Sequence, residues 1–188
     1  AGRAGRTGPG VAIRCWSKVE HGARKRFTPP EIENSDLAGA RLTLAAWAAA
    51  SGIADTELLT PPPAKLLAAS EELLVHIGAM TDDRAITPLG SRIADVPLHP
   101  RLARMVLDAN ERGEGWLACV VAALLTERDV LRSGGNDVPS DLRLRVQLVV
   151  DPTERHPMLD IAALRSVREQ ADDLAARLRI ATGSVDLE

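Results

Sequence analysis

The stretch GAMTDDRAITPLG, residues 78–90, decides how this chain folds. Gly78 ends the apolar helical pattern that precedes it, since glycine readily adopts the backbone geometry that closes a helix. Residues 79–87 then predict two short strands around an Asp-Asp turn. Pro88 starts a brief helix that continues to Val96, because proline is tolerated in the first helical turn. The stretch therefore predicts a hairpin followed directly by a helix.

Helices are also predicted ahead of this hairpin. Asp36 is a suitable N-cap for a helix that carries several leucines and Trp47 and closes at Gly52. A second helix begins at the prolines of 61–63 and carries apolar residues at helical spacing as far as Ile77. Helices, a hairpin and a final helix over residues 36–96 outline a winged-helix domain.

This predicted domain is not suited to reading DNA sequence. A helix that reads bases in the major groove carries Arg, Lys, Asn or Gln along one face. The helix over residues 62–77 offers only Lys65, set against Glu71 and Glu72. The sequence therefore argues against major-groove recognition.

Residues beyond Pro97 predict a helical bundle. Amphipathic patterns predict helices over 101–112, 114–127 and from about 157 to 180. Apolar and polar residues alternate over 142–148, which by periodicity indicates a strand. We nevertheless predict a helix there, because the neighbouring segments are helical and no second strand is close enough in sequence to pair with it. The predicted fold class is therefore mainly α, a winged helix followed by a helical bundle.

The composition limits the cellular compartment and the kinds of functional site that we expect for this protein. Hydrophobic residues make up 45% of the 188 residues and aromatic residues only 2%, which favours a folded core of packed helices. Cys15 and Cys119 are too far apart to indicate a disulfide framework, and no histidine has the spacing of a metal site. No apolar run approaches the roughly 20 residues of a membrane span. These features predict a cytoplasmic protein with no membrane span and no metal site.

The N-terminal end is basic. Residues 1–30 contain seven Lys or Arg residues and one acidic residue, Glu20, whereas the remainder of the chain is acidic on balance. Such an end suggests contact with phosphate, although a solvated charged tail has the same composition. Residues 11–16 predict a short strand, and a polar basic loop is expected over 17–26.

The opening residues AGRAGR, 1–6, resemble the latter part of motif VI, Q-R-x-G-R-x-G-R, of superfamily 2 helicases of the DEAH-box type. The Gln and first Arg of that motif are expected just upstream of residue 1. Six further segments are similar to motifs of this family and occur in its order: GVAIRCW (10–16), FTPPEI (27–32), LTPPP (59–63), IGAM (77–80), ITPLG (86–90) and VPLHPRL (96–102). The run LLTERD, residues 124–129, is similar to the bacterial HrpB-like subgroup.

The resemblance implies a domain arrangement and a function. Residues 1–28 would be the end of the second RecA-like α/β domain, 29–96 the winged helix, 97–182 a ratchet-like helical bundle and 183–188 a tail. The parent protein would be an ATP-dependent RNA helicase. Its partners would be single-stranded RNA or another nucleic acid and the upstream RecA-like domains of the same polypeptide.

The resemblance also implies which residues act on ATP. Arg6 would be the arginine finger that reaches the γ-phosphate, with Arg3 as a companion contact and Gly5 between them at the nucleotide. Their spacing would place both arginines on one face of a helical turn, facing one cleft. ATP and Mg²⁺ would be bound mainly by upstream domains, because this chain contains no G-x-x-x-x-G-K-[ST] loop. The chain alone is therefore expected to be inactive as an ATPase.

Three questions stay open at the level of sequence. Arg101 and Arg128 are the candidates for residues that face an RNA channel, although both also fit ordinary surface charges. The segment 127–129 could be an RNA-touching or catalytic cluster or simply a solvated helix end. A non-enzymatic winged-helix adaptor is the alternative to the helicase, and upstream phosphate-loop and DEAH motifs would decide between them.

Overall fold

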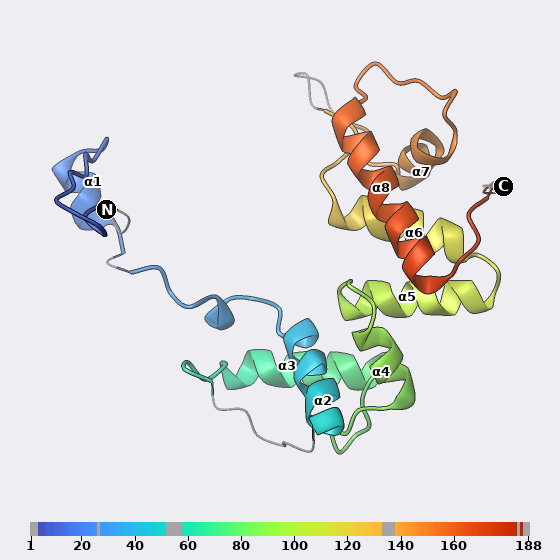
Figure 1. Cartoon of the computed structure of the whole chain (residues 1–188), viewed down its shortest axis with the longest axis horizontal. Coiled ribbons are helices and arrows are strands. Elements are labelled where there is room, and N and C mark those ends of the chain that lie inside the picture. Colours follow the sequence, from blue (N-terminus) through green and yellow to red (C-terminus); the bar gives the residue numbers. More distant parts are fainter. Residues whose placement is uncertain (1–3, 26, 52–57, 133–137, 184, 186–188) are drawn as a thin grey trace. The chain divides into compact units, whose positions relative to one another are not determined.

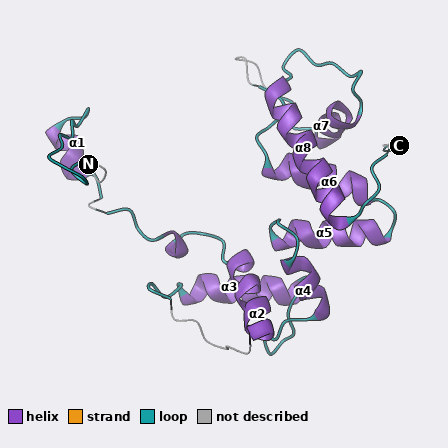
Figure 2. Cartoon of the chain, in the orientation of Figure 1, coloured by secondary structure: helices purple, strands orange, loops and turns teal. Residues whose placement is uncertain are grey.

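The computed structural model describes residues 4–25, 27–51, 58–132, 138–183 and 185. Within these residues it contains eight α-helices, one short 3-10 helix and two isolated β-bridges, and no extended strand (Figures 1 and 2). The chain divides after Ser35 into two compact units, residues 1–35 and 36–188. The mainly α fold predicted from the sequence is confirmed.

The N-terminal unit contains the helix α1 (Lys18–Ala23) and the 3-10 helix η1 (Glu31–Glu33). Helix α1 begins with a capping box, in which the Ser17 hydroxyl accepts from the Glu20 backbone N–H and the Glu20 carboxylate accepts from the Ser17 backbone N–H. This pattern of Ser followed three residues later by Glu stabilises a helix start. The expected basic loop over 17–26 therefore contains a short helix.

The predicted strand over residues 11–16 is wrong. These residues have no regular structure, and the side chains of Val11 and Ile13 are 87% and 84% exposed. A strand needs a neighbouring strand to pair with its backbone N–H and C=O groups. No described residue of this chain pairs with 11–16, so the β-propensity of its side chains is not enough to form a strand.

The second unit begins with three helices in the order that the sequence predicts: α2 (Ala38–Ser51), α3 (Ala64–His76) and α4 (Pro88–Ala94). The Asp36 carboxylate accepts from the Ala38 backbone N–H at 2.8 Å, as expected for an N-cap. Thr87 caps α4 in the same manner by accepting from the Gly90 N–H at 2.9 Å, with Pro88 as the first helical residue. The local signals at these helix starts were sufficient to locate them.

The predicted hairpin is present in reduced form. Met80 and Ile86 form one isolated antiparallel bridge in place of two strands. Gly78 has φ +74°, in the left-handed region that favours glycine, and it turns the chain out of α3. Gly90 lies so close to the hairpin that a Cβ atom there would collide with the Ala79 carbonyl oxygen. The wing is therefore a tight turn packed directly onto α4.

The rest of the unit is a four-helix segment: α5 (Pro100–Glu111), α6 (Gly115–Thr126), α7 (Leu142–Val150) and α8 (Ile161–Leu178). The helix predicted against the periodicity over 142–148 is confirmed as α7. Asp141 caps α7 by accepting from the Arg143 backbone N–H at 2.8 Å. Helix α6 packs against α5, α7 and α8 and is the central element of this segment.

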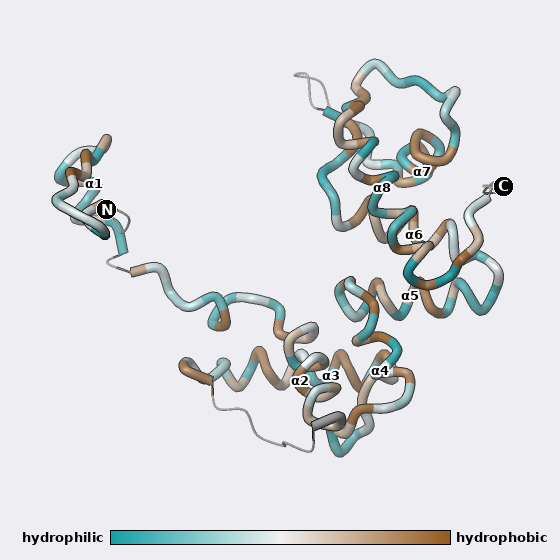
Figure 3. The backbone as a smooth tube through the Cα atoms, viewed as in Figure 1, coloured by the Kyte–Doolittle hydropathy of each residue, from teal (hydrophilic) through white to brown (hydrophobic). Residues whose placement is uncertain are grey.

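Two clusters of buried apolar side chains stabilise the second unit. One joins α2, α3 and α4 to α5, α6 and the end of α8, and the other lies among α6, α7 and α8. Trp116 on α6 packs against both. Hydrophobic and hydrophilic residues interleave along α8, as expected for a helix with one buried face (Figure 3). The winged-helix segment thus shares a core with the bundle, and the predicted domain limits at 28, 96 and 182 stay a prediction.

No helix in the described part of the chain is both long enough and apolar enough to cross a membrane.

Candidate functional site

The segment that was predicted to face ATP lies in the N-terminal unit. Gly5 has φ +81°, and Gly10 lies so close to it that a Cβ atom on Gly10 would collide with the Gly5 backbone. Residues 4–8 form a turn and a bend, so Arg6 does not lie in a helical turn as its spacing predicted. The Arg6 side chain is exposed, and Arg3 lies outside the described residues.

Aromatic and basic side chains gather just after this segment. The Arg24 guanidinium carbon lies 4.2 Å from the centroid of the Trp16 ring, within the range of a cation–π contact. Trp16 Nε1 donates to His21 Nδ1 at 3.4 Å. Helix α1 brings these three residues together on the surface of the N-terminal unit, where all three are exposed. Part of the basic charge of this end is therefore ordered around an aromatic ring.

Arg101, the first predicted channel residue, is exposed in the first turn of α5. Its backbone N–H donates to His99 Nδ1 at 3.3 Å, and the neighbouring Pro100 is buried. Among the described residues, Arg101 is not part of the polar network that surrounds Arg128. The structure therefore places the two candidates at separate positions.

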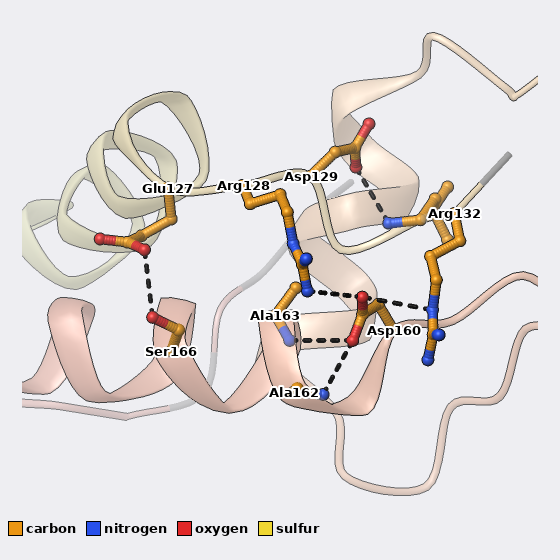
Figure 4. A network of polar contacts seen from close by, with 9 residues as sticks. Glu127, Arg128, Asp129, Arg132, Asp160, Ala162, Ala163 and Ser166 are labelled. Carbon is orange, nitrogen blue, oxygen red and sulfur yellow. Dashed lines mark hydrogen bonds and ion pairs between the residues drawn. The ribbon is translucent and has the colours of Figure 1, made fainter. Parts of the chain in front are cut away.

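Arg128, the second candidate, is anchored on a buried carboxylate. Its Nη2 group lies 2.7 Å from Oδ2 of Asp160, and Nε of Arg132 lies 3.2 Å from the same oxygen (Figure 4). The other oxygen, Oδ1, accepts from the backbone N–H groups of Ala162 and Ala163 at 3.0 and 3.1 Å. Asp160 therefore caps the N-terminus of α8 and pairs with two arginines at once.

Backbone pairing fixes the segment that carries these arginines. Leu131 and Leu159 form an isolated antiparallel bridge. On either side of it, the Arg132 N–H donates to the Met158 carbonyl at 2.8 Å and the Asp160 N–H donates to the Val130 carbonyl at 2.7 Å. Val130 and Leu131 are buried in the core among α6, α7 and α8. The arginines are thus attached to a rigid part of the fold.

Two more polar contacts fix the residues between α6 and this bridge. Asp129 makes a two-point ion pair with Arg145 on α7, with distances of 2.9 Å from Nε to Oδ1 and 2.6 Å from Nη2 to Oδ2. Arg145 also donates to the carbonyl groups of Pro139 and Asp141. The Ser166 hydroxyl on α8 donates to Glu127 Oε2 at 3.0 Å (Figure 4). The segment 127–132 is therefore tied to both α7 and α8.

The two aspartates of this network have lowered pKa values for different reasons. The hydrogen bond from the Arg145 side chain is the main cause that lowers the pKa of Asp129. The backbone N–H of Ala163 is the main cause that lowers the pKa of Asp160, and the charges of Arg128 and Arg132 add to it. Both carboxylates are therefore held ionised, as acceptors of the network.

The sequence indicates Arg128 but not the residue that positions it. Asp160 lies 32 residues further along the chain and directly before an amphipathic helix, so the N-cap preference was the one local signal that could have indicated it. The segment 127–129, interpreted as a solvated helix end or a cluster, is a network of ion pairs and hydrogen bonds. No group of three or more His, Cys, Asp or Glu among the described residues could hold a metal ion.

Comparisons with known proteins agree with this fold. Residues 70–98 match the winged-helix part of the helicase-associated domain, HA2. The ATP-dependent RNA helicase HrpA of Escherichia coli strain K12 is 34% identical over 133 residues, which are 68% of this chain and 10% of the relative. The chain matches the C-terminal region of DEAH-box RNA helicases. The family resemblance and the winged helix drawn from the motifs are confirmed, and the helicase hypothesis is favoured over the adaptor.

Other relatives show the same similarity. The ATP-dependent RNA helicase HrpB of the same E. coli strain is 34% identical over 138 residues, which are 73% of this chain and 17% of the relative. The crystal structure of E. coli DEAH/RHA helicase HrpB superposes on 98% of this chain and 21% of its own, with a TM-score of 0.69 and 29% identity. The human probable ATP-dependent RNA helicase DHX35 is 29% identical over 86% of this chain and 23% of the relative. The chain thus spans less than a quarter of each of these DEAH-box relatives.

Proposed function

We propose that this chain is part of an ATP-dependent RNA helicase, in which it supplies the arginine finger and accessory domains that line the RNA path. The observation that carries the proposal is the ordered series of helicase motifs from residue 1 to residue 129, supported by the match of residues 70–98 to HA2. The small share of each relative that the chain spans fits a protein in which the ATP-binding domains lie upstream.

The proposed role of Arg6 is to stabilise the transferred γ-phosphoryl group of ATP. A guanidinium is planar and permanently charged, so it can pair with two phosphoryl oxygens in the transition state, which a lysine ammonium cannot match in geometry. Arg3 and Gly5 would contact the same nucleotide. Arg6 is exposed beside the tight turn at Gly5, as are all described residues from 4 to 25, so the motif itself carries this assignment.

ATP and Mg²⁺ are assigned to upstream RecA-like domains in this proposal. The described residues do not fit a Mg²⁺ site, because they contain no group of three or more carboxylate, His or Cys side chains. This chain would therefore complete an ATP site that other parts of the polypeptide build. A cytoplasmic location belongs to the proposal, because it suits an RNA substrate and two unpaired cysteines.

The proposed RNA contacts of this chain are to the phosphate backbone. A translocating helicase must accept any sequence, so contacts to phosphate and ribose suit it better than contacts to base edges. Arg101 and Arg128 are the proposed contacts, and their exposure at the start of α5 and after α6 supports this assignment. Trp116, the one aromatic residue between 97 and 182, packs against both core clusters and is only partly exposed, which makes it a poor stacking platform.

The test of this function is RNA-stimulated ATP hydrolysis by the full-length parent. Arg6→Ala should reduce the turnover rate by roughly 10³-fold while leaving RNA affinity nearly unchanged, as expected for the loss of an arginine finger. Lys18→Ala, which removes an exposed basic residue of the same unit outside the helicase motifs, serves as the control and should leave turnover near the wild-type rate. The isolated 188-residue chain should hydrolyse no ATP. An Arg6→Ala parent with wild-type turnover would show that the motif has been misassigned.

A further inference from the structure

We propose that Arg128 and Arg132, positioned by Asp160, form a two-arginine clamp for the phosphodiester backbone of single-stranded RNA. The inference rests on the proposed helicase function and adds to it two residues, Arg132 and Asp160, and a means of positioning. It is carried by the geometry around one buried carboxylate (Figure 4).

The three side chains differ sharply in exposure. The Asp160 side chain is 5% exposed, whereas those of Arg128 and Arg132 are 72% and 68% exposed. Each arginine therefore has one nitrogen held at a buried anchor, while most of its guanidinium faces solvent. Two guanidinium groups that converge on one oxygen are brought close enough together to contact the same stretch of backbone.

The two arginines have N–H donors that Asp160 does not use. Each guanidinium carries five N–H donors, and the contacts to Asp160 use Nη2 of Arg128 and Nε of Arg132. One carboxylate compensates only one of the two positive charges. Asp129 pairs with Arg145, whereas Glu127 accepts from the uncharged Ser166 hydroxyl and keeps its own negative charge. The clamp therefore offers a phosphate mainly its unused N–H donors, with one net positive charge on the two arginines and Asp160.

The position of the clamp is fixed before any ligand arrives. The bridge between Leu131 and Leu159 holds the backbone, and the N-cap bonds of Asp160 hold the carboxylate. Exposed ion pairs of long side chains usually contribute little to stability because ordering them costs entropy. In this cluster the two arginines are already ordered in the folded chain, so less conformational entropy is lost when RNA binds. Preordered arginines are what recognition of a phosphate group requires.

The chemistry of the site favours a nucleic-acid backbone over bases. Guanidinium groups pair with phosphate oxygens at two points, and Trp116, the one aromatic residue between 97 and 182, is not part of the clamp. An acidic peptide could also supply carboxylates to two arginines. The experiment must therefore distinguish binding of an acidic peptide from binding of RNA.

The experiment measures RNA binding by the full 188-residue chain with a fluorescent 12-nucleotide poly-U strand at 50 and 200 mM salt. The double variant R128Q/R132Q should bind roughly tenfold more weakly at low salt, and the slope of log affinity against log salt should become shallower by about 1.4, since each phosphate contact of a single strand contributes about 0.7. Glutamine can still donate to Asp160, so the anchor keeps a partner. R92Q removes an exposed arginine from the Arg92–Glu111 pair on α4 and α5 and should change neither value.

Asp160→Asn tests the positioning. Asparagine retains N-cap ability but no longer holds the two guanidinium groups by charge. The variant chain is more positive by one unit, so an electrostatic effect alone would strengthen RNA binding. We expect affinity to fall several-fold instead, with the thermal melt measured in parallel to verify that the chain is folded. Binding stronger than wild type in a folded variant would contradict the positioning role.

The outcomes separate the clamp from the function on which it rests. Wild-type binding that R128Q/R132Q leaves unchanged would overturn the clamp and leave the RNA-channel proposal standing. A wild-type chain that binds no RNA at 50 mM salt would contradict the channel role and the clamp together. Binding of poly-glutamate as tight as that of poly-U, lost in the double variant, would assign the arginines to an acidic protein partner instead.

Discussion

The two units of this chain differ in what they carry: the first contains the motif with a proposed function, and the second contains the core that stabilises the fold. The N-terminal unit carries the motif with the best-defined proposed role, yet every described residue from 4 to 25 is exposed. The second unit contains two buried clusters and all of the helices longer than six residues. Burial of apolar surface is the main favourable contribution to folding. A motif can therefore be recognised in a segment that contributes almost nothing to the stability of the chain that carries it.

The largest expected difference between the units is in cysteine reactivity. Cys15 is exposed in the N-terminal unit, whereas Cys119 is fully buried in α6 and burial raises the pKa of its thiol to about 11. At pH 8 only about one Cys119 thiol in 10³ would be ionised, and the thiolate is the species that reacts. We expect an alkylating reagent to modify Cys15 at least roughly 10³-fold faster than Cys119, because burial also blocks access.

Mass spectrometry of tryptic peptides during a time course measures both rates in one sample. In denaturant the two cysteines should react at similar rates, which serves as the internal control. Rapid modification of Cys119 in the native chain would mean that α6 opens frequently, and the second unit would then lack the stable core described here.

The next difference concerns apolar side chains. Leu74 is fully buried in the core that joins the winged-helix segment to the bundle, whereas Ile13 is 84% exposed. Leu74→Ala should lower the free energy of unfolding by about 2–5 kcal/mol through lost burial and a residual cavity. Ile13→Ala should change it by less than about 0.5 kcal/mol, as is usual for surface positions. Urea unfolding followed by circular dichroism measures both, and equal effects would show that residue 13 packs in solution.

The same contrast explains which elements could be predicted from the sequence. Residues 11–16 and 142–148 both suggested strands, one by β-propensity and the other by alternation. The first has no regular structure and the second is α7. The secondary structure of neither segment is determined by its own residues alone. A strand over 11–16 would require a partner strand, and α7 is stabilised by its contacts with α6 and α8. Helix starts marked by Asp36 and Pro88 were readable because their signals are local.

The polar network could be predicted only in part for a related reason. Arg128 was identifiable as a basic residue at a helix end, but its partner Asp160 is 32 residues away and Arg145 is 16 residues from Asp129. The packing of α7 and α8 onto α6 determines these pairings. Sequence therefore indicates which side chains can form ion pairs, whereas the tertiary fold determines which pairs form.

The smallest expected difference concerns two carboxylates with lowered pKa values, one in each unit. A hydrogen bond from the Arg145 side chain is the main cause at Asp129, and a hydrogen bond from the Ser17 backbone is the main cause at Glu20. A carboxyl whose pKa is lower in the folded state stabilises the fold above its unfolded pKa, and this contribution is lost as pH falls through the folded pKa. The Asp129 pair is partly exposed, so solvent screening limits its contribution to about 1 kcal/mol.

Asp129→Asn should therefore lower the free energy of unfolding at pH 7 by about 1 kcal/mol. The difference from wild type should shrink as pH falls below about 4, because the wild-type carboxyl is protonated first in the unfolded chain and, at lower pH, in the folded one. Comparing the two proteins at each pH cancels the titration of Asp160, which is present in both. Glu20→Gln is the matched control: its capping box stabilises only α1, which buries no residue, so unfolding of the second unit should be unchanged at every pH. If the difference in unfolding free energy between Asp129→Asn and wild type is as large at pH 3 as at pH 7, the contribution of Asp129 comes from packing and hydrogen bonding and not from its charge. A measurable effect of Glu20→Gln on the main transition would mean that the two units unfold together, and the separation of motif from core would not hold in solution.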